Sequence, residues 1–143
     1  MLDIGGVFVR RGDLEMLLIG DNSARPSANP VAFIPTPHRD LGRWRLTGEI
    51  CDGKCYGGAM KPGTGLAHKA CANLCIEGGL PPVLVMELPV EGTTVVLLAA
   101  SDGGPMPHWM LDLTAIPLQL EGQLERRDDL LILRVDQSSV QRM

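Results

Sequence analysis

All four cysteines of this 143-residue chain lie between positions 51 and 75. They are Cys51, Cys55, Cys71 and Cys75, and His68 lies between the second and the third. Thiols this close together can form disulfides, share a metal ion or exchange redox state. No other part of the sequence combines residue types and spacing that suggest chemistry beyond packing, so this segment is the first candidate for function.

Residues 66–77 are predicted to form a helix. Proline and glycine at 62–65 precede the segment, and Gly78 and Gly79, followed by prolines, provide a C-terminal stop. At about 100° per residue, two groups of side chains fall on opposite sides of this helix. One is a polar stripe of Lys69, Asn73 and Glu77, and the other holds Ala67, His68, Ala70, Cys71, Leu74 and Cys75. The glycine-rich loop before the helix can fold Cys55 back to the same point.

Two interpretations of this cluster remain open. A metal site would use Cys55, His68, Cys71 and Cys75 for zinc or another thiolate-bound metal, with Cys51 as a competing ligand. The spacing matches no zinc-finger pattern well, because structural zinc usually prefers Cys-x2-Cys knuckles. Two disulfides impose fewer conditions, and each would stabilise a small fold by about 2–4 kcal/mol. Structural disulfides without a cofactor are therefore favoured, with a metal or thiol redox site as the alternative.

The elements that must position these residues read as β-strands. Runs at 45–51, 83–88 and 93–98 are rich in β-branched and aliphatic residues, and 118–135 reads as a hairpin. We therefore expect a mainly β chain that forms a small OB-like β-barrel, with the helix inserted between its early strands.

The N-terminal residues 4–19 also read as a hairpin, and they resemble the C-terminal one. Setting Gly6 over Gly122 places Asp13 over Asp129 and Leu14 over Leu130. This repeat suggests that 1–21 is the remnant of a first barrel, that 22–43 is a proline-rich linker, and that 44–143 is a complete barrel. The chain would then be part of a longer protein; alternatively, Met1 is the true start and the hairpin simply adds to one barrel.

Composition limits the function classes. The net charge of −4 and an aromatic content of 3% lack the basic and stacking surfaces of nucleic-acid binding. No run reaches the roughly 18 apolar residues that span a bilayer, and no signal peptide is visible. Four cysteines in a short chain nevertheless favour an oxidising compartment. We expect an extracytoplasmic or membrane-associated location, through a missing upstream segment, if the chain is truncated, and a cytoplasmic one if Met1 is the true start.

The cysteine segment resembles a family of uncharacterised bacterial proteins. Their shared pattern is Thr-Gly-x-x-x-Asp-x-x-Cys, then His-x-x-Cys-x-x-x-Cys and a glycine pair, in a small OB-like barrel, and the match covers about residues 44–136. The matching positions are Asp52, Cys55, His68, Cys71, Cys75, Gly78 and Gly79. Cys51 departs from the pattern, since an aliphatic residue is usual there, and this leaves the cysteine pairing open. The resemblance implies an exported or membrane-anchored protein.

The expected function is a non-catalytic, extracytoplasmic binding or accessory module with a structural cysteine cluster. Its sheet would contact an unknown protein or a cell-envelope component. A metal-binding or thiol redox protein is the second hypothesis, and a hydrolase or transferase with a site near His108 is a weaker third.

Overall fold

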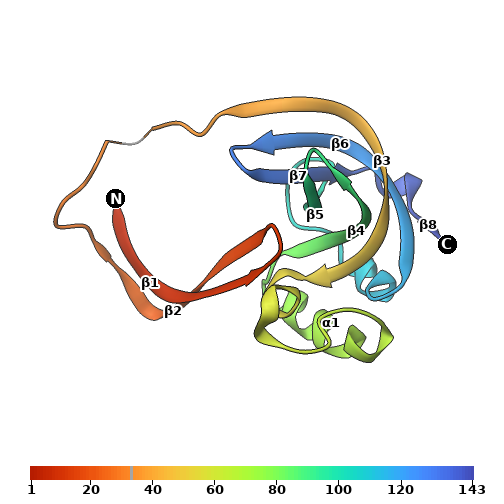
Figure 1. Ribbon diagram of the computed structural model, residues 1–143, viewed down its shortest axis with the longest axis horizontal. Helices are drawn as coiled ribbons and strands as arrows, with labels where there is room; N and C mark the ends of the chain where they lie inside the picture. The colour runs from red at the N-terminus through yellow and green to blue at the C-terminus, as the bar shows by residue number, and fades with distance from the viewer. Residues whose placement is uncertain (33) are drawn as a thin grey trace.

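The computed structural model describes residues 1–32 and 34–143; Phe33, in the expected linker, lies outside the described residues. The chain is mainly β, as predicted, with 53% of its residues in strands. A two-stranded sheet comprises β1 (Leu2–Arg11) and β2 (Leu14–Pro26). The larger sheet, shown in Figure 1, comprises β3 (His38–Asp52), β4 (Pro82–Val90), β5 (Thr93–Ala100), β6 (Pro117–Arg127), β7 (Leu130–Val135) and β8 (Gln141–Arg142).

The larger sheet closes on itself as an uneven barrel. Its strands follow the order β3-β4-β5-β7-β6, and β6 also pairs with β3. β5 and β7 run parallel, whereas the other pairs of this ring are antiparallel. A five-stranded Greek-key barrel is the architecture of the OB fold, so the expected OB-like barrel is confirmed.

The long strand β3 makes the closure, because it pairs with two different strands. Its residues His38–Glu49 face β6, and Gly48–Asp52 face β4. Gly48 lies where the two pairings overlap, and a Cβ there would collide with the backbone carbonyl of Val85. Glycine thus allows the close backbone approach that the bend of β3 requires.

The barrel interior is aliphatic. Alternate residues of the strands point inward, as the period of two in β-structure requires. Fully buried members include Ile50, Leu84, Val96, Leu118, Leu120, Leu124, Leu131, Leu133 and Val135. The helix therefore adds to a core that the strands already form.

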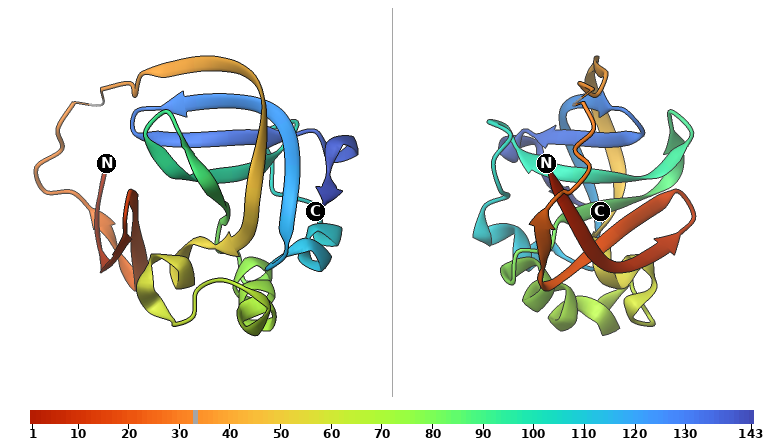
Figure 2. Two further views of the ribbon diagram at one scale, coloured as in Figure 1. Left: turned by 45° about the vertical axis from the view of Figure 1, so that its right-hand side comes forward. Right: turned by 90° about the vertical axis from the view of Figure 1, so that its left-hand side faces the viewer.

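The helical part follows β3 and precedes β4, between the first two strands of the barrel, as predicted (Figure 2). It consists of the turn η1 (Cys55–Ala59), the 3-10 turn η2 (Leu66–His68) and α1 (Lys69–Glu77). Two further 3-10 turns are η3 (His108–Leu113) and η4 (Gln137–Ser139). Within the described ranges, none of the helices has the length and apolar character needed to cross a membrane.

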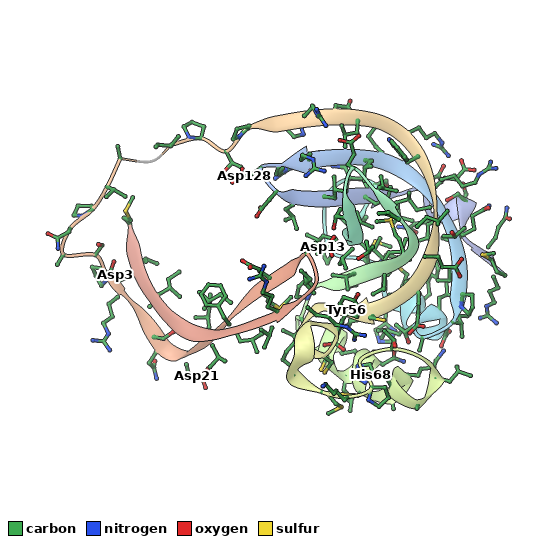
Figure 3. The ribbon with its side chains drawn as sticks, in the orientation of Figure 1. Asp3, Asp13, Asp21, Tyr56, His68 and Asp128 are labelled. Atoms are coloured by element: carbon green, nitrogen blue, oxygen red, sulfur yellow. The ribbon has the colours of Figure 1, made fainter. Side chains whose placement is uncertain are left out.

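The hairpin β1–β2 projects from the barrel and is attached near its turn (Figure 3). Asp13 accepts hydrogen bonds from the Thr94 amide at 2.6 Å and from the hydroxyls of Thr93 and Thr94. The Arg11 guanidinium lies 4.6 Å from the centre of the Tyr56 ring, close enough for a cation–π interaction. Leu14 is buried against the barrel.

The stretch between β2 and β3 is shorter than the expected linker at 22–43. β2 continues to Pro26, whose partner is Leu2, and β3 begins at His38, opposite Arg127. Pro26 is tolerated because it stands at the end of its strand.

Candidate functional site

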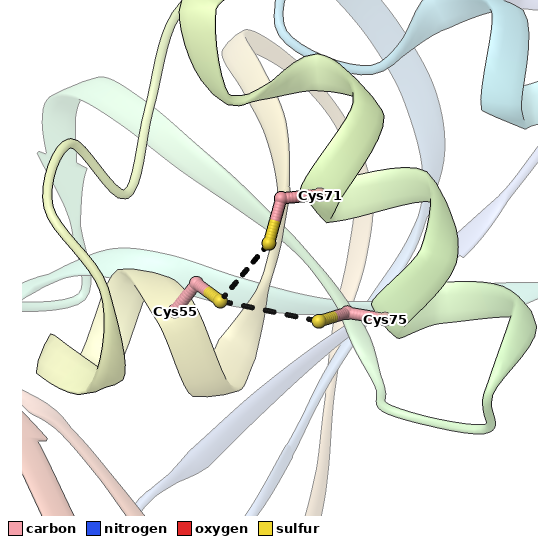
Figure 4. A group of neighbouring side chains, drawn as sticks. All are labelled: Cys55, Cys71 and Cys75. Atoms are coloured by element: carbon pink, nitrogen blue, oxygen red, sulfur yellow. Dashed lines mark hydrogen bonds between the residues drawn. The ribbon is translucent and has the colours of Figure 1, made fainter.

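Three of the four cysteines lie together beneath the barrel. Cys55 begins η1, and Cys71 and Cys75 lie one turn apart on α1. The Cys55 Sγ is 3.8 Å from that of Cys71 and 3.9 Å from that of Cys75, and all three sulfurs lie within 4.8 Å of one another (Figure 4). Cys55 is buried and the other two are partly exposed. Helical phasing placed Cys71 and Cys75 on one side of the helix, and the glycine-rich loop was expected to bring Cys55 to them, as the structure shows. His68, which was expected with Cys71 and Cys75, groups instead with Asp52 and Cys55.

A buried Asp–His pair joins the two segments that carry the cysteines. Asp52 Oδ1 accepts the Cys55 backbone N–H at 2.8 Å, and Asp52 Oδ2 lies 3.0 Å from His68 Nε2. One ligand atom each of Asp52, Cys55 and His68 lie within 4.8 Å of one another. Asp52 therefore fixes the turn that holds Cys55 and the residue that precedes α1.

The position of Asp52 caps a helical turn. The turn starts at residue 53, directly after Asp52. The Cys55 N–H, three residues after Asp52, donates to the Asp52 carboxylate, as the third amide of a helix does to an N-cap residue. From the sequence, Asp52 was expected only as part of the cysteine motif. The Asp-x-x-Cys spacing was the signal that could have revealed its capping role.

Gly78 and Gly79 end α1, as expected. The Leu80 N–H bonds the Cys75 carbonyl and the Gly79 N–H bonds the Ile76 carbonyl, both at 3.0 Å. Gly79 has φ +93°, a left-handed conformation that favours glycine. This is a Schellman motif, and it fixes the last turn of the helix, which carries Cys75.

The polar stripe of α1 docks on the segment around η3. The Lys69 ammonium donates to the Asp112 carbonyl at 2.7 Å, and the Thr114 hydroxyl is bonded to Asn73 at 2.5 Å. The buried side of the helix is narrower than predicted. Leu74, which was expected to point inward, is 71% exposed. Ala67 and Ala70 are exposed as well.

Cys51 belongs to a different environment from the other cysteines. It is buried with Leu14 and Tyr56, and its Sγ lies 3.4 Å from Glu49 Oε1. It takes part in neither His/Cys/Asp group found among the described residues. All four cysteines are free thiols. The expected pair of disulfides is not formed. Because Cys51 lies apart, only Cys55, Cys71 and Cys75 are close enough to pair, and three cysteines can form at most one disulfide.

The environment of the cluster favours the neutral thiol form of Cys55 and Cys75. Burial raises the pKa of the Cys55 thiol, and the nearby Asp52 carboxylate raises it further. The same two causes, burial first, raise the pKa of Cys75. A thiol with a raised pKa is a poor nucleophile, whereas a bound cation displaces the thiol protons and compensates the thiolate charge.

The remaining histidines lie outside the cluster. His108 is exposed and lies 3.0 Å from Glu77, beside a cavity of about 140 Å³ with a mostly apolar lining. His38 pairs with Glu125 at 3.1 Å. A larger cavity, about 470 Å³, lies between the hairpin and the barrel, and its lining includes none of the cysteines.

Comparisons with known proteins add no relative: no protein-family model matches the chain, and no curated protein or solved structure is similar to it. The family resemblance of the cysteine motif stays a prediction.

Proposed function

We propose that this protein is a non-catalytic module that binds a thiophilic metal ion through Cys55, Cys71 and Cys75. The observation that carries the proposal is the convergence of three sulfurs from two segments within 4.8 Å of one another. Three thiolates select soft or borderline ions such as Zn²⁺ or Cu⁺ over Mg²⁺ and Ca²⁺, which prefer oxygen ligands.

The sulfur separations support a shared ion. Two thiolates bound tetrahedrally to one zinc, each at about 2.3 Å, are about 3.8 Å apart. The two distances from Cys55 are 3.8 and 3.9 Å, whereas a disulfide requires about 2.05 Å.

His68 is the proposed fourth ligand, with Asp52 as its orienting partner. Histidines that bind a metal usually donate their other ring N–H to a carboxylate, a backbone carbonyl or water. Asp52 takes this role at His68 Nε2, at 3.0 Å, so the ion would be bound through Nδ1. Among the described residues His68 groups with Cys55 and not with Cys71 or Cys75, so its ring would turn toward the three sulfurs when the ion binds. The four proposed ligands are those of the metal hypothesis from the sequence.

The ion would serve a structural role. Cys55 lies on η1, which follows β3, and Cys71 and Cys75 lie on α1, so one ion would join the helix to the barrel. A closed site of four protein ligands is typical of structural zinc.

The test is a zinc competition titration of the reduced full chain. We expect one tightly bound zinc per chain, and a loss of affinity of at least about a hundredfold for each of Cys55→Ser, Cys71→Ser and Cys75→Ser. For Asp52→Asn we expect a smaller loss, about 10- to 100-fold.

Cys51→Ser is the matched control, because it removes a buried thiol four residues from Cys55 that belongs to neither group. We expect it to bind zinc as tightly as the parent chain. Equal losses for Cys51→Ser and Cys55→Ser, or no binding by the parent chain, would contradict the proposal.

A single disulfide between Cys55 and Cys71 is the second candidate role: their sulfurs are neighbours at 3.8 Å and would have to approach to about 2.05 Å on oxidation. It would support the accessory module expected from the sequence and an oxidising compartment. Intact mass separates the two roles. For a disulfide, the mass rises by two hydrogens when reductant is added. For a metal site, reductant leaves the mass of the denatured chain unchanged, and the native mass includes the bound ion.

A further inference from the structure

The N-terminal hairpin repeats the geometry of β6–β7. Every cross-strand pair of β6–β7 has a counterpart in β1–β2 at a constant offset of 116 residues, which takes the pair Arg11–Leu14 to Arg127–Leu130. The pairs Phe8–Leu17 and Leu124–Leu133 correspond in the same way. Because a slip by one residue would turn every side chain to the other face, an identical register means an identical division into faces.

Two backbone details follow the same offset. The first turn residue is Gly12 in one hairpin and Asp128 in the other, and both have φ +59°. A Cβ on Gly6 would collide with the Leu18 carbonyl oxygen, as one on Gly122 would with that of Arg134. The two hairpins therefore share turn, register and close strand approach.

In the barrel, both edges and the inner face of β6–β7 are covered. The free edge of β6 pairs antiparallel with β3, and that of β7 pairs parallel with β5. The inner-face residues Leu124, Leu133 and Val135 are each 0% exposed. The meander β3–β4–β5 is thus the surface that this type of hairpin closes.

Away from the turn, the equivalent face of β1–β2 is largely exposed, with Leu17, at the position of Leu133, half-buried. Phe8, at the position of Leu124, is 72% exposed, and Ile19, at the position of Val135, is 59% exposed. Among the described residues, β1 and β2 pair only with each other. The counterpart of Leu131 is Glu15, which pairs with Arg10 near the turn, so the apolar part of this face lies away from the turn.

The opposite face of the hairpin is the one attached to this chain. Val9 lies against Gly57 of η1, and Leu14 and Met16 approach the barrel beside it. The right-hand view of Figure 2 shows the hairpin crossing in front of the barrel, with its strands exposed. One face is thus used here, and the other has no partner among residues 1–32 and 34–143.

We propose that β1–β2 is the closing hairpin of a second barrel, and that its face around Phe8, Leu17 and Ile19 binds a three-stranded meander built like β3–β4–β5. A partner polypeptide presents this meander, with one edge strand that pairs antiparallel with β1 and one that pairs parallel with β2. A second copy of this chain does not fit, because its own β3–β5 is already closed by β6–β7.

The test attaches a defined meander to the full chain. The probe is a second copy of residues 38–116 joined directly to Met1, since the offset of 116 places Met1 at the position of Pro117. We expect the amides of β1 and β2 to exchange with deuterium at least about tenfold more slowly than in the parent chain. Unchanged exchange in the hairpin would overturn the proposal.

Two variants of the extended chain test whether the slower exchange depends on the face that carries Phe8 or arises from any stabilisation of the hairpin. Phe8→Asp should restore the fast exchange, whereas Val7→Asp should not, because Val7 is 65% exposed on the opposite face of the same strand. Equal effects of the two variants would contradict the proposed face. A parent chain that forms dimers by light scattering, with Phe8 protected, would assign the face to a second copy instead.

Discussion

His68 Nε2 and Asp52 Oδ2 lie 3.0 Å apart, and both side chains are almost completely buried. Asp52 ends β3 and His68 precedes α1, so this bond connects the barrel to the inserted helix. Because Asp52 also accepts the Cys55 N–H, one carboxylate organises both halves of the cysteine cluster.

Removal of this carboxylate should destabilise the metal-free protein. We expect Asp52→Ala to lower the free energy of unfolding by about 3 kcal/mol, because it leaves the buried His68 ring and the Cys55 N–H without their partner. Urea denaturation measures the change. Asp21→Ala, at an exposed position of β2, should stay within about 0.5 kcal/mol of the parent. A loss below about 1 kcal/mol for Asp52→Ala would argue against this role.

Asp13 should control the attachment of the hairpin rather than the stability of the barrel. Its bonds to Thr93 and Thr94 join the turn of β1–β2 to β5. We expect Asp13→Ala to speed amide exchange in β1 and β2 about tenfold while the melting temperature of the barrel changes little. The matched control is Asp129→Ala, at the equivalent and exposed position of the other hairpin. A similar effect of both variants on β1–β2 would count against the anchor.

Glu125 should make the fold sensitive to acid. Burial alone would raise the pKa of Glu125, but the His38 hydrogen bond and the charges of Arg134 and Arg127 lower it below its ordinary 4.5. A carboxyl group with a lowered pKa stabilises the fold above its unfolded pKa, and this contribution is lost as the pH falls through the folded value. Stability should therefore decline below about pH 4.5, and less steeply in Glu125→Gln.

Urea denaturation from about pH 6 to about pH 3 measures this slope. Glu87→Gln is the control, since Glu87 is exposed on β4. The interpretation fails if Glu125→Gln and Glu87→Gln show the same decline.

The two glycines after α1 should differ in how much a substitution by alanine destabilises the protein. Gly79 has φ +93°, whereas Gly78 has φ −73°. We expect Gly79→Ala to lower the free energy of unfolding by about 1–2 kcal/mol, because a Cβ disfavours the left-handed conformation. Gly78→Ala should cost less than half of this in the same thermal or urea unfolding experiment. The reverse order would contradict the Schellman assignment.

Much of the fold could be predicted because its signals are local. The strands at 45–51, 83–88 and 93–98 follow from their apolar runs and bounding turns, and the structure confirms them within β3, β4 and β5. The extent of β3 could not be predicted in this way. Its first half is ordered by pairing with β6, a contact between residues such as His38 and Arg127 that are far apart in the sequence.

The candidate site was predicted in part. The four-residue spacing of Cys71 and Cys75 was enough to place both on one helix face, and Cys55 joins them. The separation of Cys51 was missed, although strand alternation could have indicated it. Cys51 and Asp52 are consecutive in β3, so their side chains point to opposite faces, and only Asp52 reaches the cluster.

The central claim, a metal ion held by three thiolates, is tested most directly by the absorption spectrum of the reduced full chain with Co²⁺. Cobalt adopts the tetrahedral thiolate geometry of zinc and shows sulfur-to-metal charge-transfer bands. We predict saturation at one cobalt per chain, a loss of about a third of the charge-transfer intensity in each of Cys55→Ser, Cys71→Ser and Cys75→Ser, and an unchanged spectrum in Cys51→Ser. No charge-transfer band in the parent chain, or an equal loss in Cys51→Ser, would contradict the account.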